Sequence, residues 1–515
     1  MGWCAQIRRG VPVVLVALLL TASVRSAARP QYGGVLRVEL RTSSVTLNPS
    51  RWKAGSPEYA ANSRLAELMF ERLVSLDNYG RFQPQLATEW SSDATGKRWQ
   101  FTLRPGVKFS DGTPLTASDV VAALQGMLPK EMQIAATAIG VVIQAASPAN
   151  DLLEMLASGP YFVYRSEAKG GLIGTGPFVL ETSPPEAAAG KESGSNAAAG
   201  QAQHLRFRFN EQCWSGRPFV DAIEVTLGVP PLRALLDVQL GKADVAELSE
   251  DTARRAQQSN LKLWASAPLT MYGLRFGAPA KSENVRTLRE ALSFSLDRNA
   301  MAGVLLQKQA EPAASFLPQW LSGYAFLYEV ESNLERAREL RASLPASAVG
   351  AAQPLRVGVD GGNELAKLIA ERVVVNARAA GIALQIISRG AAHSASDGGA
   401  TKLDSEAQVL AWRYTSLSAR DALQNLALLT KSGIPEGGVP GDADARYAWE
   451  KRMMDEKNIV PLVAVPDFAA VDQRVRNWSP APWGEWRFAD VWIDQGAAAA
   501  GPGNAAKKMP AGARP

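Results

Sequence analysis

The sequence predicts an α/β protein with two or more sheets, and three observations support this class. Residues 35–40 (VLRVEL) alternate apolar and charged side chains, which is the pattern of a strand. Residues 60–75 carry leucine and methionine at helical spacing. Residues 355–359, 363–380 and 382–387 have the patterns of a strand, a helix and a strand. This order favours two parallel strands, because a parallel pair needs a long crossover.

The segment that follows the first helix shows the same patterns. Residues 98–104 (RWQFTLR) alternate again, and residues 111–114 (DGTP) have the composition of a tight turn. Thr116 can cap a helix with its hydroxyl, while Asp119 favours the positive N-terminal end of that helix. We therefore expect a strand, a turn and a capped helix in this order.

Strands and helices continue to alternate in the second part of the chain. Gly241 and Gly381 each follow a helical segment and can end it in the left-handed conformation. Asp297 and Arg298 lie near the end of another such segment, where we expect an ion pair. The strands are expected at 205–209, 222–227 and 460–465, and the helices at 231–240, 285–307 and 446–457.

The first 28 residues have the organisation of a signal peptide. Arg8 and Arg9 precede an apolar run of about a dozen residues, and small residues follow it. The run is too short to cross a hydrocarbon core of about 30 Å. We expect cleavage after Ala28 and export to the periplasm or the cell exterior, and an uncleaved anchor is the alternative.

Two further stretches are not expected to join the folded body. Residues 184–203 (PPEAAAGKESGSNAAAGQAQ) contain no aromatic or β-branched side chain and no apolar period. Such a stretch buries too little surface to offset its ordering entropy, so we expect a flexible insertion. Residues 496–515 are mostly Ala, Gly and Pro with a few charged residues, and we expect a disordered tail.

Composition argues against several classes of function. The chain has 55 basic and 50 acidic residues, and three of the arginines lie in residues 1–28. The near-neutral remainder gives no electrostatic case for nucleic acid. Two cysteines and two histidines are too few for a cysteine-rich zinc site, and Cys213 is expected in the core. His204 and His393 lie in loop-like surroundings, which weakens a serine–histidine enzyme. We expect no metal, no cofactor and no catalytic activity.

Several motifs stand in a characteristic order along the chain. The most specific is 84–121, where PQLATEW is followed by a strand and then by LRPGVKFSDGTPLTASDVV. The shorter motifs are Gly33-Gly34, Leu47-Asn48-Pro49, Gly174-Thr175-Gly176-Pro177, Gly241-Lys242-Ala243-Asp244-Val245 and Arg289-Glu290-Ala291-Leu292 leading to Asp297-Arg298. Together they resemble the family 5 extracellular solute-binding proteins, the peptide, nickel and oligosaccharide receptors of ATP-driven (ABC) importers. The resemblance covers about residues 33–480.

The resemblance implies a two-lobed fold of the periplasmic-binding-protein type with mixed sheets. Two crossing strands would join the lobes near 269–276 and 458–465, and lobe one would carry an additional subdomain. The implied division is a signal peptide (1–28), lobe one (29–270, with the subdomain at about 70–165 and the insertion at 184–203), lobe two (271–459), a return to lobe one (460–495) and the tail (496–515).

The resemblance also implies a function without covalent chemistry. An exported, monomeric receptor would capture a small polar or oligomeric solute by hinge closure and deliver it to the membrane subunits of an ABC importer. Three alternatives stay open. The first is an exported carboxylate- or serine-dependent enzyme on the same scaffold, and the second is a binding protein that has lost transport. The third is a cytoplasmic regulator, which residues 1–28 disfavour.

Candidate ligand-binding residues follow from the resemblance. Peptide-binding relatives carry a stacking tryptophan and an aspartate that pairs with the peptide ammonium. Trp412 stands at the tryptophan position, whereas Thr415 or Ser416 stands at the aspartate position. We therefore expect weak binding of ordinary peptides, with Tyr414 in the same segment and Arg413 able to hold an anion. The alternative is that Trp412 lies in the core and Arg413 faces solvent.

A second pocket wall is expected from the loop after Leu47-Asn48-Pro49. Relatives present backbone groups from this loop to the ligand, so Lys53, Gly55 and Ser56 are candidates here. Lys53 could equally be a surface charge, because lysines on loops are mostly exposed.

Overall fold

The computed structural model describes residues 29–53, 55–167, 170–181, 203–259, 261–277, 280, 282–345, 354–389, 407–430 and 438–494. The expected signal peptide, the tail and all but the last residue of the expected insertion lie outside the described residues. The expected β-α-β unit is present, since strand β16 (Leu355–Asp360) pairs in parallel with β17 (Leu384–Arg389) around helix α11 (Glu364–Ala379).

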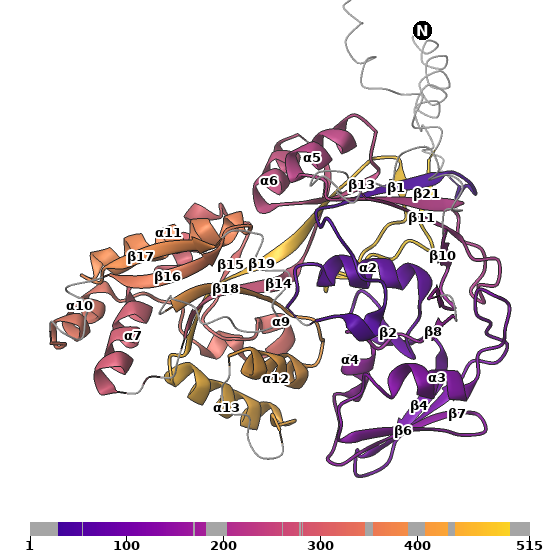
Figure 1. The fold of residues 1–515 in the computed structure, drawn as a ribbon, viewed down its shortest axis with the longest axis horizontal. Helices are drawn as coiled ribbons and strands as arrows, with labels where there is room; N and C mark the ends of the chain where they lie inside the picture. The colour runs from indigo at the N-terminus through magenta and orange to yellow at the C-terminus, as the bar shows by residue number, and fades with distance from the viewer. Residues whose placement is uncertain are drawn as a thin grey trace, which may run out of the picture.

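One mixed sheet of eleven strands runs through the whole molecule (Figure 1). Its order is β10-β11-β12-β1-β13-β19-β14-β18-β16-β17, and β15 (Glu311–Pro312) pairs with β19. The two central strands, β14 (Lys262–Phe276) and β19 (Ile459–Val471), are long and antiparallel, and both continue from one half of the sheet into the other. We call the half with β1 lobe one and the half with β16 lobe two.

Lobe one packs one face of its strands against an apolar layer, and helices cover part of the other face. Leu36, Val38 and Leu40 of β1 face helix α2 (Tyr59–Met69) and the aromatic residues near the end of the chain, among them Trp486. Helices α5 (Pro231–Gln239) and α6 (Glu250–Gln258) cover β13 and β19 on the opposite face. The strands of this half are β1 (Val35–Leu40), β10 (Phe178–Leu180), β11 (His204–Phe209), β12 (Ala222–Leu227) and β13 (Val245–Leu248).

A smaller antiparallel sheet in the order β4-β5-β7-β6 forms a subdomain with its own core beside lobe one (Figure 1). Its strands are β4 (Ala87–Ser92), β5 (Arg98–Leu103), β6 (Met132–Ala136) and β7 (Gly140–Ala145), and its helices are α3 (Ala117–Leu124) and α4 (Leu152–Leu156). The expected cap of α3 is present, because the Thr116 hydroxyl accepts from the Asp119 amide and the Asp119 carboxylate accepts from the Thr116 amide. Shorter strands accompany this subdomain: β2 (Val74–Leu76) with β3 (Phe82–Pro84), and β8 (Arg165–Ser166) with β9 (Leu172–Ile173).

Lobe two packs helices on both faces of its sheet, and the second layer lies against β14, β18 and β19. Helices α7 (Glu283–Ser295), α10 (Leu334–Ala342) and α11 pack on one face. Strand β18 (Ala407–Arg413), helix α12 (Ala419–Thr430) and helix α13 (Ala443–Asp455) contribute to the core on the other face. The loop between β15 and α10 carries the short helix α9 (Gln319–Ser322) on that same side.

Two expectations about residues 285–307 are wrong. Helix α7 ends at Ser295, and a short helix α8 (Arg298–Ala300) and one turn of π-helix (Met301–Leu305) follow. Asp297 caps α8 by accepting from the Ala300 amide at 2.8 Å, while the Arg298 Nε donates to the Pro461 carbonyl at 2.8 Å. Neighbouring side chains on a helix point in different directions, so adjacency in sequence did not produce an ion pair.

Candidate functional site

A narrow cavity lies where the two lobes, the subdomain and the C-terminal segment meet. Its volume is about 40 Å³, which is room for only a few water molecules. Because both lobes contribute to its wall, their separation sets its size. The lining residues are Ser63, Arg72, Ser158, Gly159, Leu269, Trp320, Tyr414, Thr415, Ser416, Leu417, Trp483 and Glu485.

Two aromatic side chains form the lobe-two wall of the cavity. The Trp320 and Tyr414 rings meet edge to face, with centroids 6.4 Å apart. The Trp320 indole donates to the Pro268 carbonyl at 2.9 Å, and the Tyr414 hydroxyl donates to the Phe316 carbonyl. These bonds satisfy both polar tips, so that the two residues line the cavity without an unpaired polar atom.

A buried carboxylate holds the loop that carries Trp320. Glu450 of α13 is fully buried and accepts from the Phe316 amide at 2.7 Å and from the Tyr324 hydroxyl at 2.8 Å. Burial raises the pKa of Glu450 to about 7, although these hydrogen bonds act in the opposite direction. Glu450 therefore positions one wall of the cavity from behind.

The opposite wall is charged but close to neutral overall. Arg72 donates to Glu485 at 3.2 Å, to Glu67 at 3.4 Å and to the Gly159 carbonyl at 3.1 Å, and its guanidinium lies 3.8 Å from the centre of the Phe162 ring. Within the described chain, its Nε has no hydrogen-bond partner. Burial, reinforced by the nearby Glu485, raises the pKa of Glu67 to about 8. Arg72 and Glu485 thus balance each other at the cavity wall.

An ion-pair network stands behind the cavity, where the long strands cross. The two terminal guanidinium nitrogens of Arg413 donate to the Asp467 carboxylate, at 2.8 and 2.6 Å. Arg64 donates to the same carboxylate at 2.5 Å. Arg64 also pairs with Glu247 at 3.0 Å. Burial alone would raise the pKa of Asp467, but the two arginines outweigh it and lower this pKa to about 2.

The candidates in the 412–415 segment occupy three environments. Trp412 is 5% exposed and packs in the lobe-two core, where a Cβ on Gly273 would lie 2.9 Å from its ring. Arg413 is engaged by Asp467. Tyr414 and Thr415 line the cavity, together with Ser416.

The other three candidates lie outside the cavity. Lys53 and Gly55 are exposed and Ser56 is half-buried, on the loop after the 3₁₀ turn Pro49–Arg51. The Ser56 amide donates to the Lys53 carbonyl at 3.1 Å, so this backbone bonds within its own turn. A role of all seven candidates in ligand binding remains a proposal.

The sequence reasoning missed most of the cavity wall. Arg72, Ser158, Trp320, Trp483 and Glu485 belong to no motif that the sequence analysis identified. These residues come from separate parts of the chain, so no local spacing could have grouped them. A buried arginine such as Arg72 cannot be distinguished from an exposed one by sequence alone.

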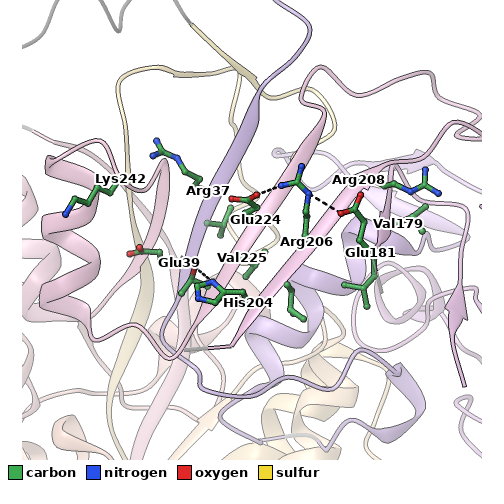
Figure 2. A pocket seen from close by; sticks show the side chains of 14 residues that line it. Arg37, Glu39, Val179, Glu181, His204, Arg206, Arg208, Glu224, Val225 and Lys242 are labelled. Carbon is green, nitrogen blue, oxygen red and sulfur yellow. Dashed lines mark hydrogen bonds and ion pairs between the residues drawn. The ribbon is translucent and has the colours of Figure 1, made fainter. Parts of the chain in front are cut away.

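A larger groove of about 930 Å³ lies on the outer face of β10, β11, β12 and β1 (Figure 2). Arg206 projects between Glu181 and Glu224 there and pairs with both, and the His204 ring lies 3.2 Å from the Thr226 hydroxyl. Such cross-strand pairs are typical of a solvated sheet face. The groove belongs to lobe one alone, so lobe closure cannot enclose a solute in it.

Neither a metal centre nor a membrane span is found among the described residues. They contain no cluster of three or more His, Cys, Asp and Glu side chains that could hold a metal ion. They contain no helix that is both long and apolar enough to cross a membrane. Cys213 is a free, half-buried thiol, in contrast to its expected core position, and His393 lies outside the described residues.

Comparison with known proteins points to one family of binding proteins. The model of the bacterial extracellular solute-binding proteins, family 5, matches residues 81–433. The periplasmic murein peptide-binding protein MppA of Escherichia coli is 24% identical over 404 residues, which span 68% of this chain and 71% of that protein. The nickel-binding periplasmic protein of the same organism is 24% identical over 273 residues, 47% of this chain and 49% of that protein.

Solved structures confirm the two-lobed fold. The substrate-binding protein CtaP of Listeria monocytogenes superposes with a TM-score of 0.73 at 16% identity and covers 90% of this chain and 100% of that one. The structure of MppA superposes with a TM-score of 0.69 at 17% identity, over 90% and 99% of the two chains. At this identity the likeness establishes the fold and does not identify a ligand.

Proposed function

Because the chain belongs to the family 5 bacterial extracellular solute-binding proteins, we propose that it captures a solute between its lobes and delivers it to the membrane subunits of an ABC importer. Members of this family are binding proteins. The observation that carries the proposal is the cavity walled by both lobes, because a solute there contacts each lobe and can favour their closed arrangement. We further propose that the protein acts as a monomer in the periplasm or outside the cell, with the division into lobes expected above.

The crossing strands supply a hinge for this mechanism. Pro268 of β14 lies opposite Pro466 of β19, and the strand register shifts on both sides of this pair. Proline has no amide hydrogen, so neither residue can donate to the ladder there. The ladder between β14 and β19 therefore lacks amide donors at this pair of prolines, which supports bending between the lobes at this point.

The hinge is directly connected to the cavity wall. Trp320 donates to the Pro268 carbonyl, and the Tyr414 amide donates to the Leu269 carbonyl at 2.9 Å. On the lobe-one side, the Ala267 amide donates to the Pro482 carbonyl at 2.7 Å, next to Trp483. A solute that orders these aromatic rings would therefore also bias the hinge.

The charge balance of the cavity favours a neutral polar solute. Glu485 already accepts from Arg72 and from Arg487, at 3.2 and 2.7 Å. Arg413 would have to leave Asp467 before it could hold an anion. Ser63, Ser158, Thr415 and Ser416 line the cavity together with the aromatic rings, and this lining suits a hydroxyl- or amide-rich molecule. Peptides are the first class to test, because MppA is named for a murein peptide.

The exported-enzyme alternative is not favoured. The described histidine, His204, lies on the outer face of lobe one, away from the cavity. Arg72 and Glu485 at the cavity wall pair with each other, which gives neither a free base nor an activated nucleophile.

Native mass spectrometry of protein purified from the cell envelope tests the proposal. We expect a co-purified small molecule with the wild type and its loss with Trp320→Ala, which removes one of the two aromatic rings of the lobe-two wall. Phe326→Ala is the control, because Phe326 is 73% exposed in the same loop and does not line the cavity. Equal retention of the molecule by both variants would place the solute elsewhere.

A further inference from the structure

We propose that residues 415–418 of lobe two form a clasp with Asp151 and Ser158 of lobe one, and that this clasp controls how long a solute is retained. The inference rests on the proposed function and adds the residues that hold the lobes together. In Figure 1, α4 of the subdomain faces α12 of lobe two at this contact.

Ser418 is the central residue of the clasp. Its side chain is 1% exposed, and its hydroxyl accepts from the Asp421 amide at 3.0 Å, which caps α12. The same hydroxyl donates to the Asp151 carboxylate across the lobe boundary. Because the helix cap already orients this hydroxyl, its bond to Asp151 requires little further ordering.

The acceptor of the second clasp bond is also oriented within its own lobe. The Leu417 amide donates to the Ser158 hydroxyl at 3.0 Å, and that hydroxyl itself donates to the Glu154 carbonyl of α4 at 2.7 Å. The Tyr59 hydroxyl lies 3.5 Å from the Thr415 carbonyl and adds a weaker contact. Each lobe therefore presents groups whose orientation its own helices determine.

The clasp and the cavity share residues. Ser158, Thr415 and Leu417 line the cavity, so the amide that joins the lobes also forms part of the wall that a solute meets. With the clasp formed, the cavity measures only about 40 Å³. A solute too large for the closed cavity would keep Leu417 from reaching Ser158. The clasp thus links solute size to the stability of the closed state.

The clasp is suited to reversible contact. Across the described residues, no ion pair joins 415–421 to lobe one. Hydrogen bonds between polar groups are readily exchanged for bonds to water when the lobes separate. Opening at this side therefore exposes groups that water can satisfy.

Amide hydrogen exchange and small-angle X-ray scattering, both without added solute, test the clasp. Asp151→Ala removes the acceptor of Ser418 but leaves the Leu417 amide its own acceptor, and Asp151 caps no amide of α4. We expect about tenfold faster exchange at Leu417 and a larger radius of gyration. Exchange and scattering like those of the wild type would overturn the proposal.

Two further variants separate the clasp from helix capping. Ser418→Ala removes both the interlobe bond and the cap of α12, whereas Ser282→Ala removes the equivalent cap of α7 in lobe two. We expect similar losses of thermal stability, with faster Leu417 exchange only in Ser418→Ala. Ser418→Thr, which keeps the hydroxyl, should restore slow exchange. Since these measurements involve no solute, their failure is distinct from a failure of the mass-spectrometric test.

Discussion

The hinge side and the clasp side of the same cavity are held by different chemistry. On the hinge side, Arg413 and Arg64 share Asp467 in a buried ion-pair network, and two continuous strands join the lobes. On the clasp side, the lobes meet through the hydrogen bonds of Leu417 and Ser418. Displacement on closure is small near a hinge and grows with distance from it. Buried charges can therefore stay paired near the hinge, while the clasp uses hydrogen bonds whose groups water can satisfy when the lobes separate.

This difference predicts opposite behaviour when each side is altered. A buried ion pair that loses one partner leaves an uncompensated charge, which is costly in every conformation. A hydrogen bond that forms only on closure affects the closed state and leaves the folding of each lobe nearly unchanged.

Substitution of Asp467 should have the largest effect. Asp467→Asn leaves Arg413 and Arg64 without their shared carboxylate, and we expect the free energy of unfolding to fall by about 3–5 kcal/mol. Denaturant titration measures this loss. Glu224→Gln is the control, because its pair with Arg206 is half-exposed and should contribute less than about 1 kcal/mol. Equal losses in both variants would contradict a special role of the hinge network.

Glu450, which holds the loop that carries Trp320, should make the stability of the protein depend on pH. Burial raises the pKa of Glu450 from 4.5 to about 7, so its contribution to stability is complete below pH 4.5 and is lost as the pH rises through 7. One pKa unit corresponds to about 1.4 kcal/mol, so the total is on the order of 3 kcal/mol.

Glu450→Gln should flatten this part of the pH profile. Unfolding measured between pH 4 and 8 would show a smaller decrease for the variant than for the wild type. Some slope should remain, because burial also raises the pKa of Glu39 and of Glu71 to about 7 and that of Glu67 to about 8. Glu339→Gln, an exposed position on α10, should match the wild type. A wild-type slope in Glu450→Gln would show that another group controls the profile.

Alteration of the clasp should reverse the pattern seen at the hinge. We expect Asp151→Ala to lower the free energy of unfolding by only about 1–2 kcal/mol and to release solute about tenfold faster, which corresponds to about 1.4 kcal/mol. Stopped-flow dissociation of the co-purified solute measures the rate. A loss of stability as large as that of Asp467→Asn would mean that the clasp supports the fold of each lobe.

The smallest expected effect concerns the charge of the ligand. Glu485 at the cavity wall and Asp467 behind it are already paired with arginines. Acetylation of the amine in a pool of di- to pentapeptides should therefore change the affinity by less than about threefold, since neither of these carboxylates is free to pair with an ammonium. Calorimetric titration with both pools is the measurement. Submicromolar binding that disappears on acetylation would identify an acidic anchor, with Asp421 the first candidate.

The candidate site shows how far sequence reasoning reached. Tyr414 and Thr415 were expected at the ligand and do line the cavity. Arg413 was expected to face a ligand or solvent, and the structure pairs it with Asp467, whose role no pattern indicated. Trp412 lies in the core, which was the alternative considered for it. The identity of a side chain indicates what it can bind, but its partners depend on the strand register around it.

The sequence by itself determined the local elements and the family of folds. The strand of residues 35–40, the cap at Thr116 and the parallel unit around α11 follow from alternation, spacing and capping, each of which involves residues close in the chain. Only the tertiary structure decided the cavity, the opposed prolines and the clasp. Ser418 and Asp151 are 267 residues apart, and Arg64 and Asp467 are 403 apart. Such contacts exist only once the sheet register and the packing of the lobes bring distant segments together, and no local period encodes that arrangement.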